Sequence, residues 1–193
     1  MSSVRPAAAV AALGWLAIEI HEAGHWLAYR ALGHPAWVSF QRVTPVGPVP
    51  AAHDLAAKLA GPLLGLAAAA ACLAAARRRP TVGWVTAAFT GASLRLFPLA
   101  MDLQRALRGA GPFSDEGEIG VALGARLGIL LAFAALSSAL TFCSARLYRF
   151  ERARWAKVAL VHLGSLAVGV VAVLADALLG PAQPGPRTRR PRA

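Results

Sequence analysis

The feature that most constrains this chain is a set of apolar runs, each long enough to cross a lipid bilayer. A membrane helix needs about 20 apolar residues. Hydrophobic residues make up 57% of the sequence, above the roughly 45–50% typical of soluble domains. Because backbone groups in lipid must hydrogen-bond within their own segment, such runs predict helices. We therefore expect an all-α polytopic membrane protein with about five transmembrane helices, at 7–32, 55–76, 82–101, 119–145 and 156–179.

Two connections and the C-terminal end interrupt this apolar pattern. The stretch 33–54 mixes apolar residues with Gly and Pro, which predicts a short strand-like hairpin after the first helix, at the membrane edge. The stretch 102–118 contains Gly109, Gly111 and Pro112 and predicts a loop. The last residues are rich in Gly, Pro and Arg. We therefore expect a membrane-embedded domain over 1–180 and a disordered basic tail over 181–193.

The net charge of +11 does not indicate a nucleic-acid partner. The basic residues lie mostly between and after the apolar runs, where Lys and Arg normally flank membrane helices. With five spans, each side of the membrane receives nine Lys and Arg residues, so the charges do not decide the orientation. Arg95 and Arg126 lie inside apolar runs, and we interpret both as snorkelling toward lipid headgroups. An alternative for Arg126 is that it counters an acidic residue near the start of the fourth run.

The segment His21-Glu22-Ala23-Gly24-His25 matches the pattern HExxH. On a helix, residues four apart share one face, so His21 and His25 can hold the same zinc ion. Glu22 lies about 100° around the helix, where it can reach a metal-bound water and act as a general base. Ionisable groups inside a membrane span are costly and usually functional. The pattern therefore predicts a zinc site with His21 and His25 as ligands and Glu22 as the catalytic residue.

A catalytic zinc site needs a third protein ligand and one open position. The histidines lie in the C-terminal half of the first run. Groups on the same side come from the start of the second run, the end of the third and the start of the fourth. The candidates are His53, Asp54, Asp102 and Asp115.

The HEAGH segment, with Gly33 and a strand-like stretch after it, resembles the site-2 protease family of intramembrane metalloproteases. Ala60-Gly61-Pro62 is similar to that family's AGP motif. The family supplies its third zinc ligand as an Asp in a motif ending in Asp-Gly. Ser114-Asp115-Glu116-Gly117 is the nearest match, although Glu116 stands between the Asp and the Gly. The resemblance therefore implies Asp115 as the third zinc ligand, with Asp102 as the alternative.

The resemblance also implies an activity and a location. We expect an intramembrane zinc metalloprotease that hydrolyses peptide bonds in or near transmembrane segments of membrane protein substrates. Its place would be the bacterial cytoplasmic membrane, as a multi-pass protein and a minimal family member without a PDZ or CBS domain. The 33–54 stretch would hold the extended substrate by adding it as a strand. The alternative is a non-catalytic metal-binding membrane protein that acts through a partner; metal transport would need a polar path that the second and third runs lack.

Overall fold

The structure is a computed structural model that describes residues 4–39 and 42–147. In chain order its elements are α1 (Val4–Ala31), β1 (Ala36–Val38), β2 (Val43–Pro45), α2 (Ala51–Arg78), α3 (Val82–Ser93), α4 (Leu96–Leu107), α5 (Asp115–Ala122) and α6 (Arg126–Leu147). The prediction of a mostly helical chain with a hairpin after the first helix is confirmed. The expected helix at 156–179 and the expected tail at 181–193 lie outside the described residues.

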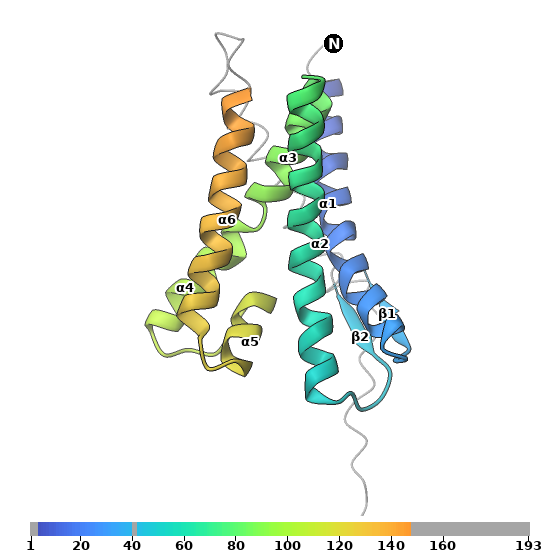
Figure 1. The fold of residues 1–193 in the computed structure, drawn as a ribbon, viewed down its shortest axis with the longest axis vertical. Helices are drawn as coiled ribbons and strands as arrows, with labels where there is room; N and C mark the ends of the chain where they lie inside the picture. The colour runs from blue at the N-terminus through green and yellow to red at the C-terminus, as the bar shows by residue number, and fades with distance from the viewer. Residues whose placement is uncertain (1–3, 40–41, 148–193) are drawn as a thin grey trace, which may run out of the picture.

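Helices α1 and α2 form an antiparallel pair that runs the length of the molecule (Figure 1). Their crossing is close because small residues meet there. A Cβ atom on Gly24 would lie only 2.6 Å from the carbonyl oxygen of Ala60 and 2.8 Å from the Cα of Gly61. Small residues at helix contacts allow this approach in membrane and soluble bundles alike. The crossing places the middle of HEAGH directly against the AGP segment.

The third apolar run, expected as one helix over 82–101, is divided into α3 and α4, each of 12 residues. Pro98 has no N–H to donate to the carbonyl of Leu94, so regular α-helix is interrupted at this point. A helix of 12 residues is about 18 Å long, which is shorter than the roughly 30 Å hydrocarbon core of a bilayer. The division also brings Arg95 to the junction between the two helices.

The fourth run, expected as one helix over 119–145, is also divided. Gly124 has φ +66°, a left-handed conformation that favours glycine. This turn separates the short α5 from α6, and α5 lies beside the lower part of α2 in Figure 1. The loop expected over 102–118 is shorter than predicted, because α4 continues to Leu107 and α5 begins at Asp115, which leaves only 108–114 between the helices.

Two of the described helices, α2 and α6, are long and apolar enough to cross a membrane, with a mean hydropathy of 2.0 over their most apolar window. Helix α1 equals α2 in length at 28 residues. It is less suited to lipid because its C-terminal half carries Glu19, Glu22 and two histidines.

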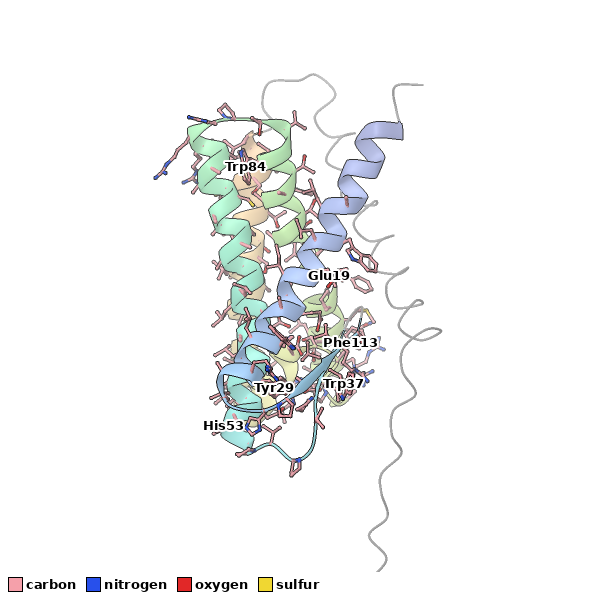
Figure 2. The ribbon with its side chains drawn as sticks, turned by 90° about the vertical axis from the view of Figure 1, so that its right-hand side faces the viewer. Glu19, Tyr29, Trp37, His53, Trp84 and Phe113 are labelled. Carbon is pink, nitrogen blue, oxygen red and sulfur yellow. The ribbon has the colours of Figure 1, made fainter. Side chains whose placement is uncertain are left out.

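The hairpin pairs β1 with β2 in antiparallel register, with Ala36 opposite Pro45 and Val38 opposite Val43. It lies beside the C-terminal end of α1, at the same end of the molecule as the start of α2 and the loop that carries Phe113 (Figure 2). Trp37 is 71% exposed on the hairpin. The hairpin therefore borders the region in which the histidines of α1 lie.

Candidate metal centre

His21 and His25 are buried side chains on the face of α1 that packs against α2. Two glycines of α2, also four residues apart, lie opposite them. A Cβ on Gly61 would collide with the ring of His25, and a Cβ on Gly65 would lie 3.9 Å from the Cβ of His21. Because the helices are antiparallel, the second glycine of α2 meets the first histidine of α1. The glycine of the AGP segment therefore makes room for an imidazole ring.

The ring of His25 is oriented by the backbone of α2. Its Nδ1 lies 2.8 Å from the carbonyl oxygen of Ala57. A carbonyl only accepts hydrogen bonds, so Nδ1 carries a proton, and in the neutral form of the ring Nε2 presents a bare lone pair. Ligand histidines are usually held in this way by an acceptor on the other ring nitrogen. The contact leaves His25 prepared to bind a cation through Nε2.

Three donor atoms converge in front of α1. His21 Nε2 lies 3.0 Å from His25 Nε2 and 3.0 Å from Asp115 Oδ2, and the distance from His25 Nε2 to Asp115 Oδ2 is 3.3 Å. With Nδ1 of His25 protonated, a lone pair of His25 faces a carboxylate oxygen and a second imidazole nitrogen. A proton on the Nε2 of one histidine, or a metal ion between the three atoms, makes this arrangement favourable. The three side chains could therefore hold a metal ion together.

Glu22 lies next to this triangle. Its carboxylate and the two histidine nitrogens are within 4.8 Å of one another. All three residues, with Asp115, line a cavity of about 780 Å³ that also reaches Val43 of β2. Glu22 thus has access to the same space as the ligand atoms without being part of the triangle.

Asp115 owes its position to the cap of α5. Ser114 is the N-cap residue, and its Oγ accepts a hydrogen bond from the backbone N–H of Gly117 at 3.1 Å. An N-cap serine satisfies a helix donor that would otherwise lack a partner. Asp115 is the first residue of the helix, so the cap directs it back toward α1. Burial opposes the charged form of Asp115, but its contacts with the two histidines outweigh burial and hold the pKa of its carboxyl below the usual range.

Asp102, the alternative third ligand, lies elsewhere and has other partners. Its Oδ2 accepts hydrogen bonds from the backbone N–H of Phe113 at 3.0 Å, from the N–H of Ser114 at 2.7 Å and from the Ser114 hydroxyl at 2.8 Å. Its Oδ1 pairs with Arg126 at 2.5 Å. Gly117 packs directly on this carboxylate, since a Cβ there would collide with it. Asp102 therefore anchors the start of α5 and so holds Asp115 in place.

The charge state of Asp102 follows from these contacts. Burial would raise its pKa, but the hydrogen bonds from Arg126 and from the loop before α5 hold it below the usual range. Arg126 also donates to the carbonyl oxygens of Ala110 and Gly111. Arg126 is therefore a counter-charge to an acidic residue, as the alternative interpretation proposed. That residue is Asp102 of α4 and not one near the start of the fourth run.

The other two candidates for a third ligand are engaged outside the triangle. Asp54 accepts a hydrogen bond from the hydroxyl of Tyr29 at 2.6 Å and pairs with Lys58 at 2.8 Å. His53 Nδ1 lies 2.9 Å from His34 Nε2, so these two loop histidines form a pair. Figure 2 shows Tyr29 and His53 near the end of the molecule that holds the hairpin.

Sequence reasoning did not foresee the position of Arg95. Its guanidinium pairs with Glu116 and lies 3.1 Å from His21 Nδ1, so it faces the centre of the molecule instead of lipid headgroups. The available signal was an arginine in an apolar run together with a second acidic residue directly after Asp115.

Compared with protein-family models, with curated proteins and with solved structures, the chain matches none of them. Its function is therefore argued from the site itself.

Proposed function

We propose that this chain is an intramembrane zinc metalloprotease, with His21, His25 and Asp115 as zinc ligands and Glu22 as the general base. The observation that carries the proposal is the triangle of His21 Nε2, His25 Nε2 and Asp115 Oδ2, with edges of 3.0, 3.0 and 3.3 Å. A zinc ion with bonds of about 2.0–2.1 Å holds tetrahedral ligand atoms roughly 3.3–3.4 Å apart. The triangle thus has nearly the size that three zinc ligands need.

The ligand set favours a catalytic zinc site. Two imidazoles and one carboxylate leave the fourth position open, as in known zinc hydrolases, whereas structural sites use four protein ligands. The open position would face the cavity that Glu22 also lines. When bound, the zinc ion would lower the pKa of water and polarise a carbonyl group. Glu22 would take a proton from the attacking water and pass it to the leaving amine nitrogen.

The membrane setting is supported by the exposure of the apolar helices α2 and α6, which the other described residues cover only in part. Only 17% of the most apolar window of α6 and 39% of that of α2 are buried. The core helix of a soluble protein would be mostly buried. Large side chains such as Leu131 and Phe142 are exposed on α6, at 56% and 63%. Contact with lipid accounts for this apolar surface and supports a membrane location; the multi-pass topology and the bacterial cytoplasmic membrane are part of our proposal.

The hairpin supports binding of an extended substrate. Hydrogen bonds from Ser39 N–H to the Arg42 carbonyl and from Val46 N–H to the Pro35 carbonyl fix which residue pairs are bonded. In this register the N–H and C=O of Val43 point away from β1, toward the free edge of β2. Val43 lines the cavity of the candidate centre. An unwound segment of a membrane protein substrate would add to this edge as a strand and pass in front of Glu22.

The test compares two variants of α1 in purified protein. The substrate is a labelled single-span Leu-Ala peptide with a central Pro-Gly pair that weakens its helix. Glu22→Gln should keep one zinc per chain and lose cleavage, because the amide cannot accept the proton. Glu19→Gln, one turn earlier on the same helix, should keep both. Cleavage by Glu22→Gln at the wild-type rate would refute the proposed role of Glu22.

The same measurements judge the alternative, a non-catalytic metal-binding protein. That protein would bind zinc and leave the peptide intact even as wild type. X-ray absorption at the zinc edge would then show four protein ligands instead of three and a solvent oxygen.

A further inference from the structure

Arg95 is a partly buried cation beside a group of candidate metal ligands, and this position needs an explanation. One guanidinium nitrogen, Nη1, lies 3.1 Å from Nδ1 and 3.3 Å from Nε2 of His21. Arginine remains charged at any physiological pH. A metal ion held by the same histidine would repel it, so Arg95 adds nothing to metal affinity by its charge.

Glu116 compensates the charge of Arg95. Its side chain is fully buried and its Oε1 pairs with Arg95 Nη2. Glu116 follows Asp115 in the first turn of α5. Adjacent residues of one helix turn therefore serve two different groups: Asp115 faces the histidines and Glu116 holds the guanidinium. The inserted residue of the motif Ser114-Asp115-Glu116-Gly117 thus has a structural partner.

Within the part of the chain that the structure describes, the ion pair between Arg95 and Glu116 leaves one polar atom of each side chain without a hydrogen bond. Arg95 Nε and Glu116 Oε2 are buried and have no hydrogen-bond partner among the described residues. Arg95 also lines the cavity next to His21 and Glu22. Of the other donors that line this cavity, Tyr29 donates to Asp54, Lys58 pairs with Asp54 and Glu118, and Arg42 is exposed in the connection between β1 and β2. Within residues 4–39 and 42–147, Arg95 is the cationic side chain that contacts His21.

We propose that Arg95 is a catalytic residue that binds the carbonyl oxygen of the scissile peptide bond. This inference rests on the proposed protease function. When the oxygen of water bonds to the carbonyl carbon, its proton passes to Glu22 and the carbonyl π electrons move to the oxygen that Arg95 faces. The carbon–nitrogen bond then breaks, and the proton passes from Glu22 to the amine. Glu116 keeps the guanidinium in place, so its role is that of a positioning residue.

The expected effect follows from comparable groups in other enzymes. Removing one donor to a developing oxyanion lowers kcat by about 100–1,000-fold. Arg95→Gln should show such a loss, with a KM within about 3-fold of wild type and one zinc per chain, because the interaction forms mainly in the transition state. Arg95→Lys keeps the charge but loses the two-pronged geometry of the guanidinium, so its kcat should lie between that of the wild type and that of Arg95→Gln. Arg108→Gln, on an exposed arginine at the end of α4, is the matched control.

A binding measurement separates this inference from the protease proposal. The probe is a phosphinic analogue of the Leu-Ala peptide, in which a tetrahedral anionic phosphorus group replaces the scissile carbonyl. Its affinity for zinc-loaded Arg95→Gln should fall by the same factor as kcat, while the affinity of the uncleaved peptide stays unchanged. Equal phosphinic affinity in wild type and Arg95→Gln, or loss of zinc from the variant, would overturn the role of Arg95. A wild-type protein that binds the probe but cleaves nothing would refute the protease function, and the same comparison would still judge Arg95.

Discussion

The contact between Gly24 and α2 offers the sharpest test of the site geometry, because it can be changed by a single methyl group. In Gly24→Ala the new Cβ would lie 2.6 Å from the Ala60 carbonyl oxygen and 2.8 Å from the Gly61 Cα, whereas ordinary contact begins at 3.4 Å. The obstacle is backbone, so no side-chain rotation removes it. Helix α1 would have to move away from α2 by roughly 0.6–0.8 Å, the shortfall from van der Waals contact.

This movement is large on the scale of a metal site. The hydrogen bond from His25 Nδ1 to the Ala57 carbonyl is now 2.8 Å. It would lengthen toward about 3.6 Å, at which separation no hydrogen bond remains. Zinc–ligand distances tolerate only about 0.2 Å. Both histidines would move relative to Asp115, and we expect zinc affinity to fall by at least the roughly 10–100-fold typical of losing a hydrogen bond that orients a metal ligand.

The assay is zinc affinity by competition with a chromophoric chelator, measured on protein whose helix content is checked by circular dichroism. Two alanine variants are matched controls. A Cβ on Gly65 would meet His21 Cβ at 3.9 Å, which is ordinary contact, and a Cβ on Gly128 meets nothing within 4 Å. Both should bind zinc as wild type does. If Gly24→Ala binds zinc as tightly as Gly65→Ala, the close crossing does not set the ligand geometry and the reasoning fails.

Three further predictions concern α5. Asp102→Asn should lower zinc affinity by about 10–100-fold, because Asp102 positions the proposed ligand Asp115. Asp115→Asn should lower it further, because it removes the ligand itself. An equal loss of affinity in the two variants, measured by the competition assay, would contradict this assignment. Ser114→Ala should destabilise the protein by about 1 kcal/mol through loss of the helix cap, and its thermal midpoint measures this. The pKa of Asp102 is lowered in the folded state, so its contribution to stability is present above its unfolded pKa of about 3.9 and is lost as the pH falls through the folded pKa. The thermal midpoint of the zinc-free protein should therefore fall when the pH is lowered below about 4, and the midpoint of Asp102→Asn should fall by less over the same pH range.

Much of the framework could be expected from local patterns. The hairpin follows from the Gly and Pro residues around short apolar stretches, because turn residues act within a few positions of themselves. The facing of His21 and His25 follows from helix periodicity alone. The divisions of the third and fourth runs near Pro98 and Gly124 were not predicted, because the apolar length of a run does not show where its helix is interrupted.

The sequence alone determines that two histidines lie on one face of a helix, with Glu22 beside them. Which of His53, Asp54, Asp102 and Asp115 lies beside the histidines depends on the tertiary structure. Asp102 and Asp115 are both close to Ser114 in space, yet only Asp115 meets the histidines, while Asp102 accepts hydrogen bonds from the loop. The physical reason is that the candidate centre joins groups about 90 residues apart in the sequence. Whether these groups meet depends on how closely α1, α2 and α5 pack, which no local pattern encodes.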